Sequence, residues 1–98
     1  MSTSFQVINS ILEQIHHASF EVQYWDFKRV KYGQTAPEFT IIFRSSAALD
    51  DVVRHVSVGF GEGYMRGDIE VEGNMQRLTE LLFDPHIFNK RPSLKTLI

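Results

Sequence analysis

Apolar residues recur along the chain at two spacings, and these spacings predict helices and strands. Between residues 4 and 17 they recur every three or four residues, which places them on one side of a helix. The apolar positions of this helix are Phe5, Ile8, Ile11, Leu12 and Ile15. Residues 47–55 and 75–83 have the same spacing, and each segment follows serine or asparagine residues suited to an N-cap. We therefore predict three helices.

The strand pattern is equally plain. Alternation of apolar and polar residues predicts strands over 20–26 and 68–72, and a β-branched, aromatic run predicts another over 39–43. Val30 and Tyr32 indicate a shorter strand between them. Tight turns, not long crossovers, join these strands. The fold class is therefore expected to be α+β, with a small antiparallel or mixed sheet and helices packed on one face.

The length of 98 residues suits one small domain. Hydrophobic periodicity fades from Asp84, and prolines with polar residues follow. We expect residues 1–84 to form the domain and residues 85–98 to begin a linker. The apolar stretch at 94–98 ends without a helix cap, which suggests that the chain continues into a larger protein.

Composition narrows the function classes. The net charge of −2 provides no basic field for phosphate backbones, so we expect no nucleic-acid partner. The chain has no cysteine, which excludes disulfides and cysteine-based zinc sites. No apolar run approaches the roughly 18–20 residues that span a bilayer, and residues 1–10 show no secretory signal. We expect a cytoplasmic location.

Few residues suggest catalysis. His16 and His17 are adjacent, so they point in different directions on a helix, and we expect no metal site. No serine lies in a Gly-x-Ser-x-Gly elbow. Three carboxylates share one face of the strand at 68–72, and we interpret them as a solvated strand face.

A glycine-rich segment spans Gly59–Gly67, with four glycines in nine residues. It predicts backbone turns or close approach of neighbouring elements. Glu62, between two of these glycines, is expected in a turn with its carboxylate against a specific partner. The segment is not expected to bind a nucleotide, because it follows a helix and leads into a strand that ends too soon for a crossover helix.

Apolar residues near these glycines suggest a binding site for an apolar ligand. Together with the strand at 39–43 they could line a cavity for an acyl chain. The candidate ligand-facing residues are Phe39, Ile41, Phe43, Phe60, Tyr64 and Met65. The alternative is that the same residues fill the core.

Two segments carry a resemblance to a known family. The first holds Val22-Gln23-Tyr24-Trp25-Asp26, Tyr32-Gly33 and Pro37-x-Phe39-Thr40-Ile41; the second runs from Gly59 to Gly73. Over residues 20–84 the chain resembles the N-terminal domain of cyclopropane-fatty-acyl-phospholipid synthases. The family's motif falls on Gly61, Glu62, Tyr64, Met65, Gly67 and Asp68. Gly63 departs from the family, which commonly has alanine there. The pattern is also similar to sterol-carrier-type lipid-binding domains.

The resemblance implies a function for a longer parent protein. The parent would transfer a methylene from S-adenosylmethionine to unsaturated acyl chains of membrane phospholipids. Residues 1–84 would be a non-catalytic N-terminal accessory domain, with cofactor and catalytic residues in a C-terminal methyltransferase domain beyond the linker. Expected partners are that domain and a phospholipid or membrane surface, at the inner membrane face, with homo-oligomers as an option. The alternatives are a stand-alone lipid carrier and a small enzyme using Glu62, Tyr64 and Asp68.

Overall fold

The computed structural model describes residues 3–15 and 17–83, so His16, His86 and the expected linker at 85–98 lie outside the described residues. A helix comes first, then three strands, two helices, a strand and a final helix. Their bounds are α1 Thr3–Leu12, β1 Phe20–Gln23, β2 Arg29–Tyr32, β3 Phe39–Phe43, α2 Ser46–Arg54, α3 Val56–Arg66, β4 Ile69–Gly73 and α4 Met75–Leu82.

The strands form one mixed sheet in the order β2-β1-β3-β4. β1 pairs antiparallel with β2 and parallel with β3, and β4 pairs antiparallel with β3. Val22 on β1 is opposite Val30 on β2 and Ile41 on β3, and Ile41 is opposite Val71 on β4. A row of apolar side chains thus crosses the whole sheet. The predicted α+β fold with a mixed sheet is confirmed.

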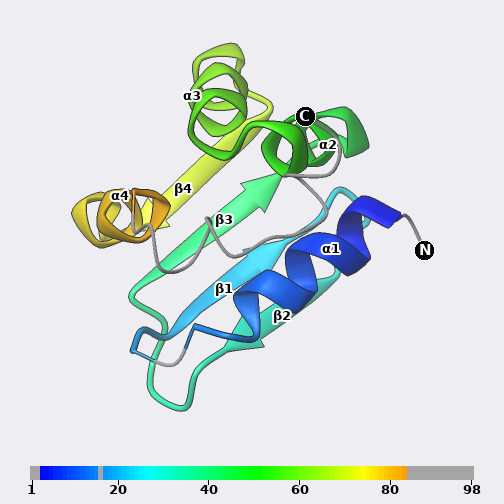
Figure 1. Ribbon diagram of the computed structural model, residues 1–98. Helices are drawn as coiled ribbons and strands as arrows, with labels where there is room; N and C mark the ends of the chain where they lie inside the picture. The colour runs from blue at the N-terminus through cyan, green and yellow to red at the C-terminus, as the bar shows by residue number, and fades with distance from the viewer. Residues whose placement is uncertain (1–2, 16, 84–98) are drawn as a thin grey trace.

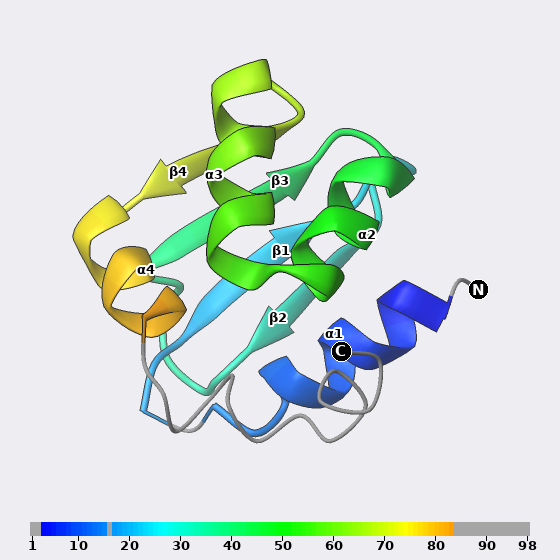
Figure 2. The same ribbon diagram turned by 45° about the horizontal axis from the view of Figure 1, so that its top comes forward.

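The helices of the described residues all cover the same face of this sheet (Figures 1 and 2). α1 lies over β1 and β2, while α2 and α4 contact β3 and α3 contacts β4. Alternate strand residues face the helices and are buried, as in Phe39, Ile41 and Phe43 of β3. The predicted packing of helices on one face is therefore confirmed.

The core is aromatic at its centre. Phe20, Val22, Leu49 and Ile69 are the largest fully buried side chains. The ring of Phe20 stacks on Tyr32 at 5.1 Å and on Phe39 at 5.2 Å between ring centroids. Burying each such side chain stabilises the fold by about 1.5–3 kcal/mol, so three neighbouring strands are held together by one group of rings.

The opposite face of the sheet is polar. Arg29 forms an ion pair with Glu21 at 3.5 Å, and the Arg44 Nε donates to a Glu70 carboxylate oxygen at 2.8 Å. Glu72 is exposed on the same face. This arrangement agrees with the solvated strand face expected from the sequence, although Asp68 precedes β4 and binds Arg66 at 3.0 Å instead.

The connection from β2 to β3 passes over the start of β1. The Thr35 hydroxyl donates to the Ser19 Oγ at 2.7 Å, and the Glu38 amide donates to the Ser19 carbonyl oxygen at 2.7 Å. Gly33 begins this connection with a φ of +90°, and a Cβ there would lie 2.3 Å from the Ser19 Oγ. Since β2 already returns the chain to the start of β1, a short loop suffices to place β3 parallel to β1.

The predicted helix caps are confirmed. The Ser45 Oγ accepts from the Ala48 amide at 3.2 Å, and the Asn74 Oδ1 accepts from the Arg77 amide at 3.0 Å. The first helix is shorter than predicted, since α1 ends at Leu12 and not at residue 17. Ile15 is nevertheless buried, because the turn after α1 folds back on the core.

Two tyrosines are buried beneath α1. Tyr24 is 3% exposed and Tyr32 is 5% exposed. Burial raises the pKa of Tyr24 far above its usual range and the pKa of Tyr32 to about 12, because a tyrosinate would lose its hydration. The Tyr32 hydroxyl donates to the Asn9 Oδ1 at 2.5 Å, whereas the Tyr24 hydroxyl has no hydrogen-bond partner within the described residues.

These tyrosines predict alkaline instability. Between about pH 10 and pH 12 the unfolded chain ionises its phenols while the folded protein keeps Tyr24 and Tyr32 protonated. The folded state then binds more protons, so the free energy of unfolding falls as pH rises, by about 1.4 kcal/mol per pH unit for each tyrosine. Urea unfolding at several pH values in this range measures how the free energy of unfolding changes with pH. In the double variant Y24F/Y32F the free energy of unfolding should no longer fall in this way as pH rises. An unchanged pH dependence would contradict the role given to these two tyrosines.

Candidate functional site

The glycine-rich segment is a helix over most of its length. α3 runs from Val56 through the glycines to Arg66, and the chain turns only at Gly67, which has a φ of 84°. The prediction of a turn over the motif residues Gly61, Glu62, Tyr64 and Met65 is therefore wrong, and only Gly67 and Asp68 lie at the turn into β4. Packing against α2 and β4 supports a helix that the glycines alone would disfavour.

Close approach of neighbouring elements, the other half of that prediction, is confirmed at two glycines. A Cβ on Gly59 would lie 2.3 Å from the Asp51 carbonyl oxygen of α2, and a Cβ on Gly63 would lie 2.5 Å from the Ile69 Cδ1 of β4. A Cβ at either position would force its neighbour to shift, and at Gly59 that neighbour is backbone. The absence of side chains at Gly59 and Gly63 thus lets α3 seat directly on α2 and β4.

The rest of the motif points outward. Glu62 is exposed and Met65 is 81% exposed, while Tyr64 is exposed but stacks on the Phe60 ring at 6.4 Å. Glu62 forms no ion pair or hydrogen bond with any described residue, so the expected specific partner is not found within them. We call Val58, Gly61, Glu62 and Met65 the outer face of α3, since helical periodicity places them on one side.

The end of α3 is fixed by charge. Arg66 binds Asp68 at 3.0 Å and Asp51 at 3.5 Å, so α2, α3 and the turn into β4 share one ion-pair network. The hydrogen bond to Asp68 is the main cause that raises the pKa of Arg66. All three side chains are substantially solvent-exposed, so the network orients the turn and adds little stability.

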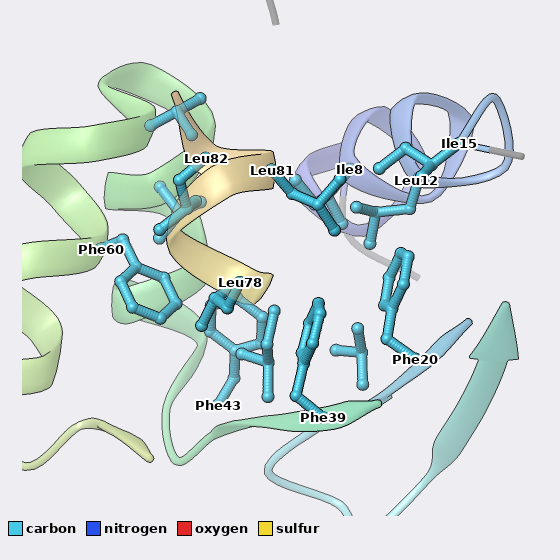
Figure 3. A pocket seen from close by; sticks show the side chains of 14 residues that line it. Ile8, Leu12, Ile15, Phe20, Phe39, Phe43, Phe60, Leu78, Leu81 and Leu82 are labelled. Atoms are coloured by element: carbon cyan, nitrogen blue, oxygen red, sulfur yellow. The ribbon is translucent and has the colours of Figure 1, made fainter. Parts of the chain in front are cut away.

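An apolar cavity lies between α1, α4 and the helix-facing side of the sheet (Figure 3). Four of the predicted ligand-facing residues line it, namely Phe39, Ile41, Phe43 and Phe60. Tyr64 and Met65 do not, because the helix turns them away from the interior. The remaining walls come from side chains that the sequence indicated only as helix stripes or strand core, namely Ile8, Leu12, Ile15, Phe20, Val22, Val52, Val56, Leu78, Leu81 and Leu82.

The cavity is small. Its volume is about 30 Å³, room for roughly two water molecules at most. Sites for small organic ligands usually have roughly 300–1,000 Å³. Every lining side chain is apolar, and side chains of α1 and α4 line the cavity together with the sheet (Figure 3). In this conformation the residues act as a core, because the cavity is too small for an acyl chain.

A second, polar hollow lies where the β2–β3 connection crosses β1. It measures about 470 Å³ and is lined by His17, Ala18, Ser19, Gln34, Thr35 and Glu38. The polar groups here largely bind one another: Ser19 bonds to Thr35, and Glu38 pairs with Arg77 of α4 at 3.2 Å. These contacts brace the loop. No sequence motif pointed to this hollow, because it assembles residues from separate turns.

No metal or membrane-spanning element emerges from the part of the chain that the structure describes. Within residues 3–15 and 17–83, no cluster of three or more histidine, aspartate or glutamate residues could hold a metal ion. The helices in the same ranges are all too short or too polar to cross a bilayer.

The two kinds of glycine in α3 give a matched test. G59A should destabilise the protein by about 1–3 kcal/mol, because its methyl group would push α2 and α3 apart. G61A meets open space in a helix interior and should stabilise the protein by about 0.5–1 kcal/mol. Chemical denaturation of both variants measures the difference. Equal effects of the same sign would contradict the packing role of Gly59.

Comparison with known protein families identifies the family of this chain. No curated protein matches the chain. A family model described as a domain of unknown function, DUF7884, matches residues 7–92, which includes every strand and the helices from α2 to α4. The match covers most of the chain, and we conclude that the protein belongs to the DUF7884 family.

Proposed function

We propose that this chain is the non-catalytic N-terminal domain of a cyclopropane-fatty-acyl-phospholipid synthase. The parent protein would transfer a methylene from S-adenosylmethionine to unsaturated acyl chains of membrane phospholipids. The resemblance over residues 20–84 motivates the parent, and the geometry of α3 supports the accessory role.

The main support for a non-catalytic, accessory role is that backbone amides of the glycine-rich segment are hydrogen-bonded within the fold. A glycine-rich cofactor loop needs backbone amides free to meet the ligand. Here the Gly59 amide donates to the His55 carbonyl oxygen at 2.6 Å, and the Asp68 amide donates to the Gly63 carbonyl oxygen at 2.9 Å. These amides serve the helix and its end, so S-adenosylmethionine would have to bind in another domain.

The outer face of α3 is where we expect the catalytic methyltransferase domain of the same chain to dock. Its motif residues Gly61, Glu62 and Met65 contribute little to the fold, since Gly61 has no neighbouring atoms within 4 Å of a Cβ position and Met65 is largely exposed. Residues that a family motif fixes without an internal role are suited to contact another domain. In the proposal the assembly works at the cytoplasmic face of the membrane, and it accommodates homo-oligomers.

A stand-alone lipid carrier similar to sterol-carrier-type domains is the second candidate. The wholly apolar lining between α1 and α4 favours it. The cavity volume of about 30 Å³ weighs against it, because the closed conformation has no space for an acyl chain. The small-enzyme alternative is weaker still, since Glu62 and Tyr64 are exposed on a helix and line neither the apolar cavity nor the polar hollow.

The parent protein gives the direct test. The coding sequence downstream of Ile98 should encode a strand, a glycine-rich turn and a helix within about a hundred residues. Calorimetric titration of the 98-residue protein with S-adenosylmethionine should give no binding heat. Saturable binding of the cofactor, or methyl transfer by these residues alone, would refute the accessory role.

A substitution on the outer face of α3 tests the docking surface. M65K in the full-length parent should lower turnover at least tenfold, while the melting temperature of the 98-residue protein changes little because Met65 is exposed. M75E, at an exposed methionine near the start of α4, is the matched control and should leave turnover unchanged. Equal effects of M65K and M75E would refute this surface.

A further inference from the structure

The turn between β1 and β2 is rigid and aromatic. The Tyr24 amide donates to the Lys28 carbonyl oxygen at 2.9 Å, and the Phe27 amide donates to the Tyr24 carbonyl oxygen at 2.9 Å. The Asp26 carboxylate accepts from the Lys28 amide at 3.0 Å. Below the turn, Tyr24 packs edge-on against Phe5 of α1 at 5.0 Å. The backbone of the turn is therefore fixed on the body of the domain.

Phe27 occupies an unfavourable backbone conformation at the tip of this turn. Its φ is 68°, and within the described residues it has the only positive φ outside glycine. The left-handed region is strained for a bulky side chain, and glycine or asparagine usually fills it. Strain of this kind persists where it serves another purpose.

The side chain of Phe27 makes no compensating contribution to the core. It is 81% exposed, and the neighbouring Trp25 is 39% exposed. The Trp25 ring packs edge-on against Tyr24 at 5.8 Å between centroids, and neither Trp25 nor Phe27 lines the apolar cavity. The protein thus exposes the Phe27 ring and part of the Trp25 ring on a hydrogen-bonded turn, which favours contact with an apolar phase outside the molecule.

Cationic side chains accompany these rings. Lys28 and Lys31 form no ion pair within the described residues, and the Lys28 ammonium lies 5.7 Å from the centroid of the Phe5 ring. Arg29 is neutralised by Glu21 at 3.5 Å. Asp26 offsets one of the two lysines, so the turn with β2 is locally positive although the whole chain carries −2.

We propose that Trp25, Phe27, Lys28 and Lys31 form a docking tip for the surface of an anionic phospholipid bilayer. Tryptophan and phenylalanine suit the boundary between headgroups and acyl chains, and lysines suit lipid phosphates. Phe27 is suited to enter this boundary because its side chain is 81% exposed at the tip of the turn. The inference rests on the proposed function for its lipid partner, and it names the surface through which this domain meets the membrane.

The protein contains its own reporter, because Trp25 is the only tryptophan in the chain. The fluorescence of the 98-residue protein is titrated with vesicles of phosphatidylglycerol and phosphatidylethanolamine in equal amounts. The Trp25 emission should shift to shorter wavelength. Vesicles of phosphatidylcholine alone should bind more weakly, and added salt should weaken binding to the anionic vesicles.

Substitution of the tip should separate binding from folding. F27N should weaken vesicle partitioning at least tenfold, and its melting temperature should be unchanged or raised by up to about 5 °C because asparagine tolerates the left-handed conformation. K28Q/K31Q should weaken partitioning about tenfold and reduce its salt dependence. F83N, at another exposed phenylalanine, is the matched control and should bind as the unmodified protein does.

Three outcomes would overturn the docking tip. The first is a Trp25 emission that does not respond to anionic vesicles, and the second is F27N binding as tight as that of the unmodified protein. The third is an emission shift that follows protein concentration without vesicles, which would indicate a contact between copies. The downstream coding sequence is read independently. A methyltransferase domain there with no vesicle binding refutes only the tip, whereas vesicle binding without that domain refutes only the proposed parent.

Discussion

Burial of a single face of the sheet is the constraint on which the rest of this structure depends. β1 and β3 are central strands, and their helix-facing residues Phe20, Val22, Phe39, Ile41 and Phe43 are all buried. A sheet covered on one side must gather its helices there, since that is the only place where their apolar stripes can be buried. The other face stays polar. This asymmetry sends the turns and the outer sides of the helices to the surface where partners can be met.

The same requirement explains the glycines of α3. Two helices and a strand crowd onto one end of the sheet, and there is space for α3 only where Gly59 and Gly63 bring backbone against neighbouring atoms. One side of α3 is thereby committed to the fold, and its outer face remains available. The glycine-rich motif resembles a ligand-binding loop in the sequence, but in the structure it is a closely packed helix whose outer face is exposed.

The sequence predicted the strands and caps well because their signals are local. Alternation defined β1 and β4, a β-branched and aromatic run defined β3, and Ser45 and Asn74 marked the starts of α2 and α4. α3 escaped prediction because each interior glycine lowers helix propensity by about 1 kcal/mol, and only tertiary packing recovers it. Treating that segment as a turn also put Tyr64 and Met65 in the cavity, whereas helical geometry turns them outward. The strained φ of Phe27 was likewise invisible, since no glycine or asparagine marks its position.

The edges of the sheet have a consequence for self-association. β2 and β4 are the outermost strands, and each leaves a row of backbone groups without a neighbour in the sheet. On the polar face, β2 displays Arg29 and Lys31 while β4 displays Glu70 and Glu72. Two molecules that joined like edges would set charges of the same sign side by side, which opposes a continuous sheet across a twofold axis. Such symmetric strand pairing is therefore disfavoured, whereas β2 of one molecule beside β4 of another would bring opposite charges together.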